Sequence, residues 1–592
     1  MKKMLDLLSE EMEKAFEAAG YEKDLGRVSV SNRPDLCEYQ CNGAMAGAKR
    51  YKKAPIMIAN EVAEKLAGSR IFKEALAVAP GFLNLKLSEE FLFEYVKEMQ
   101  KAPKYGIELD KQEKIIIDYG GPNVAKALHV GHLRSAVIGE SVKRISRYVG
   151  HDITGDIHLG DWGQPMGLVI QELKERRPEL PYFDESYTGE YPAEAPFTVA
   201  DLEEIYPTAS AKSKADEDFK ARAMEATFKL QSGVRGYRAL WEKIIDVSVS
   251  DLKRNYDNLN VHFELWNGES SVHELIPGMI QQMKDGGFAY LSEGALVVDV
   301  KEETDTKEVP PCMLLKSDGA AKYDTTDLAT ILDRTNKYHP DKIIYLTDKR
   351  QELYFTQIFR CAKKTGIVDP DTKLIHIGFG TMNGKDGKPF KTRDGGVMRL
   401  EYLIKEINDE MLKKIRDNAA EKGYDIDEKE AAETAKTVGM AAIKYGDLSN
   451  QPAKDYIFDI DRFTSFEGDT GPYILYTIVR IKSILNKYIE QGGKVENTEL
   501  MCPANDSEKE LLKLLAGFNA MMLQAGEELA PNKVCAYIYD LANAFNHFYH
   551  ETKILSEEDD KRKAGLIALL DLTKSIFETC IDVLGFEAPD RM

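Results

Sequence analysis

The sequence predicts an α/β protein with a parallel sheet in the middle of the chain, an α+β domain before it and an all-α domain after it. The 592 residues are enough for three or more domains. Residues 114–118 contain three consecutive isoleucines and enter a Gly-Gly-Pro-Asn turn, which is typical of a buried parallel strand. Beyond about Tyr402 the strand patterns give way to long amphipathic helix patterns. The expected domains are 1–112, 113–465 with an insertion at about 174–290, and 466–592.

The first domain alternates helix and strand patterns. Helical periodicity occurs at 4–19 and 58–66, and residues 81–87 have the pattern of a strand. The polar stretch 101–114, which contains a proline and a glycine, is interpreted as a linker to the second domain.

The second domain contains a βαβ pattern. A helix pattern ending at Val149 follows the strand at 114–118, and residues 152–158 supply the next strand, which together predict a βαβ unit. The charged stretch 174–227 is expected to be a partly helical insertion. Further strands are expected at 295–300, 342–347 and 373–378, the last entering a Gly/Lys-rich loop at 384–396.

The third domain is expected to be a helical bundle. Its amphipathic patterns predict single helices at 473–488, 508–523 and 533–548. No internal repeat is found that would indicate a solenoid.

Composition excludes several classes of protein. The 43% of hydrophobic residues and 30% of charged residues exclude global disorder, and no apolar run approaches the ~20 residues of a membrane helix. The N-terminus has no signal-peptide core, so a cytoplasmic protein without a membrane partner is expected. The seven cysteines contain no C-x-x-C pair, so neither a disulfide framework nor a protein-bound metal is expected. The net charge of −20 does not by itself indicate nucleic-acid binding.

The most informative motif is His129-Val-Gly131-His132, which lies after a strand and at the start of a helix. Two imidazoles beside free backbone N–H groups and the positive end of a helix dipole suit a polyphosphate. Gly131 would let a flat adenine approach the backbone. The alternative is a pair of capping or packing histidines. Neither a P-loop nor a G-x-G-x-x-G motif is present.

Several ordered motifs resemble the bacterial class I arginyl-tRNA synthetases. They are residues 121–135 (GPNVAKALHVGHLRS), 160–163 (GDWG) and 466–473 (FEGDTGPY), and the resemblance extends over essentially the whole chain. It implies a class I synthetase catalytic domain with a Rossmann-like sheet, an N-terminal domain that contacts the tRNA elbow, and an anticodon-binding helical bundle. It also implies ATP-dependent conversion of L-arginine to arginyl-adenylate and transfer of arginine to tRNA(Arg).

The resemblance assigns the ATP site. His129, Gly131 and His132 would bind ATP, and both histidines would stabilise the pentacoordinate phosphorus. The family's second ATP motif is degenerate here, with Lys391, Thr392 and Arg393 in its place. Lys126 would supply the missing charge to pyrophosphate. Mg²⁺ is expected to bridge the phosphates of ATP.

The resemblance also assigns the arginine site. Asp118 and Asn123 lie at the mouth of the first strand, Tyr323 and Asp327 form a Tyr-x-x-x-Asp pair on one helical face, and Gln351 follows. Carboxylates and side-chain oxygens on two sides match the five donors of a guanidinium. Asp161 is a weaker candidate.

Contacts with tRNA are expected at both ends of the chain. Aromatic and amide groups that could contact anticodon bases are Tyr537, Asn543 and Phe548, although most aromatic residues at helical spacing belong to a core. In the N-terminal domain the candidates are Tyr39, Gln40 and Asn42.

Two other functions stay open from the sequence. One is another class I synthetase, with lysine as the closest rival substrate, or a small nucleotidyltransferase. The other is a non-catalytic RNA-binding paralogue. The resemblance further suggests a monomer that needs tRNA before it forms the adenylate.

Overall fold

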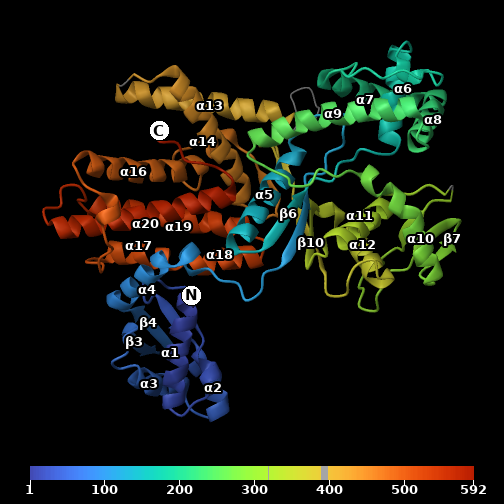
Figure 1. Ribbon diagram of the computed structural model, residues 1–592. Helices are drawn as coiled ribbons and strands as arrows, with labels where there is room; N and C mark the ends of the chain where they lie inside the picture. The colour runs from blue at the N-terminus through green and yellow to red at the C-terminus, as the bar shows by residue number, and fades with distance from the viewer. Residues whose placement is uncertain (318, 389–397, 424) are drawn as a thin grey trace. The chain divides into compact units, whose positions relative to one another are not determined.

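The computed structural model describes residues 1–317, 319–388, 398–423 and 425–592, and the chain divides into two compact units (Figure 1). One unit contains Met1–Asp110, Ser465–Val583 and Glu587–Met592. The other contains Lys111–Thr464 and Leu584–Phe586. In the described part of the chain, no helix combines the length and the apolar character needed to cross a membrane.

The second unit is built on a four-stranded sheet in the order β11-β10-β5-β6, with all neighbours parallel. The strands are β5 (Lys114–Tyr119), β6 (Asp152–Asp156), β10 (Lys342–Asp348) and β11 (Lys373–Phe379). Ile115, Ile116 and Ile117 are buried, as the apolar run predicts for a central strand. The helices that connect the strands or lead into them are α5 (Gly131–Val149), α11 (Tyr323–Tyr338) and α12 (Glu352–Thr365).

A separate three-stranded antiparallel sheet contains β7 (Ala289–Ser292), β8 (Ala295–Val298) and β9 (Cys312–Leu315). The strand expected at 295–300 therefore exists, but it does not belong to the parallel sheet. Glu293 and Gly294 both have positive φ, which makes a two-residue hairpin that pairs β8 with β7. The helix α10 (Ile276–Asp285) precedes this sheet.

The insertion is largely helical. Its helices are α6 (Gln164–Arg176), η3 (Pro181–Phe183), α7 (Val199–Ala215), α8 (Glu217–Gln231), α9 (Arg235–Asn258) and η4 (Glu269–Leu275). A capping box begins α7, because the Thr198 side chain accepts from the Asp201 N–H and the Asp201 carboxylate accepts from the Thr198 N–H.

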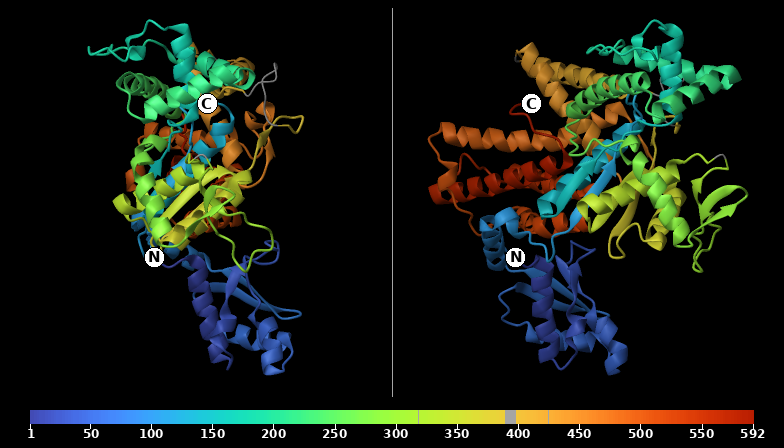
Figure 2. Two further views of the ribbon diagram at one scale, coloured as in Figure 1. Left: turned by 90° about the vertical axis from the view of Figure 1, so that its right-hand side faces the viewer. Right: turned by 45° about the vertical axis from the view of Figure 1, so that its right-hand side comes forward.

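The second unit ends with β12 (Met382–Asn383), α13 (Leu400–Lys422), α14 (Glu428–Leu448), β13 (Tyr456–Ile457) and α15 (Ile460–Phe463). The helices α13 and α14 lie side by side in both views of Figure 2. Strands β12 and β13 pair in parallel, so they fix the chain just before the Gly/Lys-rich loop.

The first unit combines the N-terminal region with the C-terminal helices. Its antiparallel sheet has the order β1-β2-β4-β3, from β1 (Val28–Val30), β2 (Tyr39–Cys41), β3 (Phe72–Val78) and β4 (Phe82–Leu87). The N-terminal helices are α1 (Met4–Ala18), η1 (Lys23–Gly26), α2 (Gly43–Tyr51), α3 (Pro55–Lys65), α4 (Glu89–Lys101) and η2 (Pro103–Gly106). The C-terminal helices are α16 (Gly471–Glu490), η6 (Val495–Asn497), α17 (Asp506–Ala516), α18 (Phe518–Glu527), α19 (Pro531–Glu551) and α20 (Asp560–Leu584).

The prediction of one helix at 508–523 is wrong, because the segment is divided into α17 and α18. The break lies at Gly517, whose N–H donates to the carbonyl of Leu514, three residues back instead of four. Glycine has a low helix propensity, which favours such a tightened turn.

Candidate active site

The two histidines of the motif lie at the start of α5 with their rings 4.0 Å apart between centroids. The backbone N–H of His129 donates to Nδ1 of His132 at 3.2 Å, and the N–H of Gly131 donates to Nδ1 of His129 at 3.0 Å. A ring nitrogen that accepts a hydrogen bond is unprotonated, so each neutral ring carries its proton on Nε2. Both imidazoles are therefore oriented to donate from Nε2.

The electrostatic environment keeps both rings neutral. Burial, and then the neighbouring His129, lower the pKa of His132 to about 3. Burial and the charge of Lys126 lower the pKa of His129. The motif therefore presents two N–H donors without adding positive charge of its own.

A side chain at position 131 would displace the ring of His129 from its present position. A Cβ at this position would lie 2.7 Å from Cε1 and 2.8 Å from Nδ1 of His129. The missing side chain lets the His129 ring fold back onto its own helix terminus, where Nδ1 can accept the Gly131 N–H.

The segment after the Gly/Lys-rich loop pairs with the motif. The N–H of Val130 donates to the carbonyl of Met398 at 3.0 Å, and the N–H of Leu400 donates to the carbonyl of Leu128 at 3.1 Å. The candidates Lys391, Thr392 and Arg393 lie outside the described residues, but the chain that follows them is hydrogen-bonded to the histidine motif.

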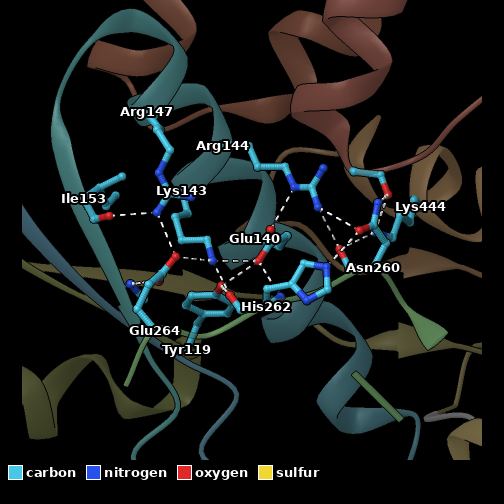
Figure 3. A network of polar contacts seen from close by, with 12 residues as sticks. Tyr119, Glu140, Lys143, Arg144, Arg147, Ile153, Asn260, His262, Glu264 and Lys444 are labelled. Atoms are coloured by element: carbon cyan, nitrogen blue, oxygen red, sulfur yellow. Dashed lines mark hydrogen bonds and ion pairs between the residues drawn. The ribbon is translucent and has the colours of Figure 1, made fainter. Parts of the chain in front are cut away.

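Helix α5 is held by a buried network centred on Glu140 (Figure 3). The Glu140 carboxylate accepts from Arg144 Nε at 2.8 Å, from the Tyr119 hydroxyl at 2.7 Å and from the backbone N–H of His262 at 3.1 Å. Lys143, which is also buried, lies 3.2 Å from the same carboxylate. Buried ionic groups of this kind are tolerated when each has its partners.

The same network reaches α14 and the chain end (Figure 3). Lys444 Nζ donates to the carbonyl of Gly585 at 2.6 Å, and Arg144 Nη2 donates to Oδ1 of Asn260 at 3.0 Å. Burial, and then the charge of Arg144, lower the pKa of Lys444 to about 7.

A second buried contact joins α5 to the base of the loop. The Arg134 guanidinium lies 3.1 Å from Oδ2 of Asp447 and donates to the carbonyl of Gly380 at 2.7 Å. The Tyr456 hydroxyl donates to the same Asp447 oxygen at 3.0 Å. The chain on both sides of the loop is thus hydrogen-bonded to α5 or to the histidine motif at its start.

Two carboxylates at the ends of β5 and β6 share one internal cation. Asp118 and Asp156 are in register, and Arg334 Nη2 lies 2.6 Å from the first and 2.8 Å from the second. Arg334 is buried and lies seven residues after Asp327 on α11, so the two share a helical face. One oxygen of Asp118 is therefore already engaged by the protein.

A second group of carboxyls has no such partner. We call Asp161, Glu269 and Asp327 the carboxyl cluster; none of them forms an ion pair with a lysine or arginine among the described residues. Burial, and then the charges of Asp327 and Asp161, raise the pKa of Glu269 to about 8. Burial raises the pKa of Asp327 to about 6 and also raises the pKa of Asp161.

Neutral groups support the carboxyl cluster. The Tyr354 hydroxyl donates to Asp327, and Ser270 donates to Asp161 from its N–H at 2.9 Å. Tyr323 begins α11 and is 66% exposed, and the charge of Glu269, after burial, raises its pKa. Tyr323 and Asp327 are thus brought close to Glu269, which the sequence analysis missed because it belongs to no motif.

The other arginine-site candidates lie at exposed turns. Asn123 forms a bridge to Gly160, and a Cβ on that glycine would lie 2.2 Å from the Asn123 amide oxygen. Gln351 is exposed directly before α12. Trp162 is buried and donates from Nε1 to His273 at 3.3 Å, so it is a core residue.

Three family models match the chain in order. The Arginyl tRNA synthetase N terminal domain matches residues 2–87, the catalytic domain of tRNA synthetases class I (R) matches 96–460, and the DALR anticodon binding domain matches 474–592. Proteins named arginine–tRNA ligase from Agathobacter rectalis and Alkaliphilus oremlandii are 64% and 54% identical to the chain, and each comparison covers 100% of both proteins. The chain belongs to the arginyl-tRNA synthetase family.

Solved arginyl-tRNA synthetases share its fold. The Plasmodium falciparum enzyme has a TM-score of 0.81 at 24% identity, and the Thermus thermophilus enzyme has 0.76 at 22%. Both comparisons cover 100% of each chain, so the Rossmann-like sheet and the all-α C-terminal region are confirmed.

Three of the residues assigned to tRNA in the sequence analysis are buried. Phe548 is 0% exposed, and Tyr537 is 8% exposed with its hydroxyl bonded to the carbonyl of Leu514 at 3.0 Å. Tyr39 is also buried, on β2 of the N-terminal sheet. None of these rings can stack on a base without unpacking its core, so their assignment to tRNA is corrected.

The remaining tRNA candidates lie at the surface. Asn42 is exposed and Gln40 is half-buried, with its amide bonded to Asn84 at 2.9 Å. Asn543 is exposed on α19 and accepts from the Tyr473 hydroxyl at 2.8 Å. Next to it, Arg480 donates to Asn546 at 2.7 Å and lies 5.2 Å from the ring of Tyr549.

Proposed function

We propose that this chain activates L-arginine with ATP to form arginyl-adenylate and pyrophosphate, and then transfers arginine to tRNA(Arg) with release of AMP. The observation that carries the proposal is the difference between the two groups of carboxylates. Asp118 and Asp156 share an ion pair with Arg334, whereas no member of the carboxyl cluster pairs with a lysine or arginine among the described residues. A guanidinium would supply that missing charge through a planar fork of donors.

The arginine would therefore bind in one orientation. Its guanidinium would face Asp327 and Glu269, with Tyr323 and Gln351 beside them. Its α-amino end would face the remaining oxygen of Asp118 and the amide of Asn123. Lysine has a compact ammonium that cannot form the planar, bidentate bonds of a guanidinium fork, which favours arginine over the rival substrate.

ATP would bind at the histidine motif. The carboxylate of arginine attacks the α-phosphorus, the bond to the β-phosphate oxygen breaks, and pyrophosphate leaves with its electron pair. His129 and His132 donate from Nε2 to phosphate oxygens on which charge increases in the transition state. Lys126, with Lys391, Thr392 and Arg393 of the loop, would bind the leaving pyrophosphate.

Magnesium would arrive with ATP. The described residues contain no group of three or more His, Cys, Asp or Glu side chains that could hold a metal ion. Mg²⁺ would be held mainly by the phosphates of ATP and by water, with few protein ligands, and would supply positive charge to the phosphate oxygens.

The tRNA would be bound by the first unit as well as the catalytic domain. We assign the N-terminal domain to 1–112, the catalytic domain to 113–465 with its insertion at about 174–290, and the anticodon-binding domain to 466–592. The surface formed by Asn543, Tyr473, Arg480 and Tyr549 offers amide, hydroxyl, cationic and aromatic groups to unpaired bases. Gln40 and Asn42 are the N-terminal candidates. We further propose a cytoplasmic monomer that needs tRNA for adenylate formation.

Aminoacylation of total tRNA with arginine or lysine tests the function. Wild type should charge arginine alone, and Asp327→Asn and His132→Ala should lose charging. Asp333→Asn is the matched control for the first variant, because Asp333 lies on the same helix and pairs with Lys337 at 2.9 Å. Charging of lysine would indicate the rival synthetase, and tRNA binding without charging by wild type would indicate a non-catalytic paralogue.

A further inference from the structure

The insertion helix α7 makes two contacts near the histidine motif. One is with Lys126, which precedes the motif, and the other is with Arg399, which follows the Gly/Lys-rich loop. Glu203 and Tyr206 lie one turn apart on α7, beside the buried residues Leu202 and Ile205. Arg399 Nη1 lies 2.8 Å from Glu203, and Lys126 Nζ lies 4.2 Å from the centroid of the Tyr206 ring. These two residues therefore bring a helix of the insertion to the ATP site.

The position of α7 is fixed from its other side. Glu172, a buried residue of α6, accepts from Lys212 of α7 at 2.7 Å and from Arg176 at 2.9 Å. Arg176 also bonds Glu204 at 3.0 Å. The helix that carries Tyr206 is thus held against α6, which begins directly after the Gly-Asp-Trp-Gly motif.

The ring of Tyr206 holds the ammonium of Lys126 without neutralising it. In the part of the chain that the structure describes, Lys126 forms no ion pair, and its charge still reaches His129, whose pKa it lowers after burial. A carboxylate in place of the ring would pair with the ammonium and compete with the phosphates of ATP. An aromatic face attracts a cation weakly, so the charge stays available.

We propose that Tyr206 is a positioning residue, which holds the Lys126 ammonium beside the histidine motif and keeps its charge free for the pyrophosphate of ATP. This inference rests on the proposed function, because it assigns a role to Tyr206 through Lys126 in the same reaction.

The test compares aminoacylation at varied ATP in Tyr206→Leu, Tyr206→Phe and wild type. Loss of the ring should lower kcat/KM for ATP about 2- to 5-fold, the size of an ordinary cation–π contact, and Tyr206→Phe should restore it. Tyr191→Leu is the matched control, because Tyr191 is in the same insertion and carries Arg235 at 4.8 Å from its ring. It should leave kcat/KM for ATP unchanged.

A double-mutant cycle with Lys126→Ala separates positioning from a general structural effect. In the Lys126→Ala background, measured in single turnovers with enzyme in excess, Tyr206→Leu should cause no further loss. The inference would be overturned if the losses of single-turnover rate multiply in the double variant. It would also be overturned if Tyr206→Leu has the wild-type kcat/KM for ATP, or if Tyr191→Leu lowers that kcat/KM equally. Failure of the wild type to charge arginine would count against the proposed function instead.

Discussion

Arginine binding to the carboxyl cluster should release a proton near neutral pH, because Glu269 must ionise to receive the guanidinium. With a pKa of about 8, Glu269 is about 90% protonated at pH 7 in the empty site. The affinity for arginine is then reduced about 11-fold at pH 7 and about twofold at pH 8. Affinity should therefore rise about fivefold from pH 7 to pH 8.

Calorimetric titration of arginine in two buffers of different ionisation enthalpy measures this proton directly. About 0.9 protons should be released per arginine at pH 7, and about 0.5 at pH 8. Glu269→Gln cannot ionise and should remove both the release and the pH dependence. The affinity for ATP over the same pH range is an internal control, since no hydrogen bond or ion pair joins Glu269 to the histidine motif among the described residues. An arginine affinity that is constant or falls from pH 7 to pH 8 would refute the reasoning.

Four further outcomes are expected. His132→Ala removes an Nε2 donor from the transition state and should lower the single-turnover rate about 10²- to 10³-fold. Arg334→Ala leaves two carboxylates without their cation and should lower the free energy of unfolding in urea by about 3–5 kcal/mol, whereas Lys337→Ala on the same helix should change it by less than about 0.5 kcal/mol. Phe548→Ala opens a cavity in the helical core and should cost about 3–5 kcal/mol in the same assay, while Asn543→Ala should spare stability and raise KM for tRNA.

If Arg334→Ala is as stable as wild type, the buried ion pair of Arg334 with Asp118 and Asp156 contributes nothing to the free energy of unfolding. An Asn543→Ala variant with unchanged KM for tRNA would remove the α19 surface from the proposed anticodon site. Full single-turnover activity of His132→Ala would exclude the proposed role of that imidazole.

The parallel sheet was predictable because its signal is local. Ile115, Ile116 and Ile117 are consecutive, and a strand buried on both faces needs no alternation. The apolar pattern likewise predicts β8 but not its sheet, since β8 pairs with β7 through a hairpin at Glu293 and Gly294, which both have positive φ. Membership of a sheet depends on the turn as well as on the strand.

The site was predictable only where its residues share a motif. His129 and His132 are close in sequence, and Tyr323 and Asp327 are one helical turn apart. Glu269 lies in a short 3₁₀ segment, and its raised pKa arises from residues distant in the chain. In the sequence alone, Glu269 cannot be distinguished from other acidic residues, because the residues that raise its pKa become its neighbours only in the folded chain.

Helical spacing did not distinguish surface from core in α19. Phe548 and Asn543 both fit the chemistry of base recognition, but one packs inside the bundle and the other faces solvent. In a helix with apolar groups on several faces, the buried face is decided by the neighbouring helices.

The network around Glu140 has a consequence for genetic selection. Loss of one member of a buried ionic group costs about 3–5 kcal/mol, while the whole stability of a domain is only about 5–15 kcal/mol. Substitution of Glu140 or Lys143 should therefore lower the melting temperature, so that the protein folds at low growth temperature and unfolds at a moderately higher growth temperature. These positions, whose polar contacts are with groups of the protein itself, are where we expect heat-sensitive alleles to accumulate, and second-site suppressors should map to the partner side chains of the same network.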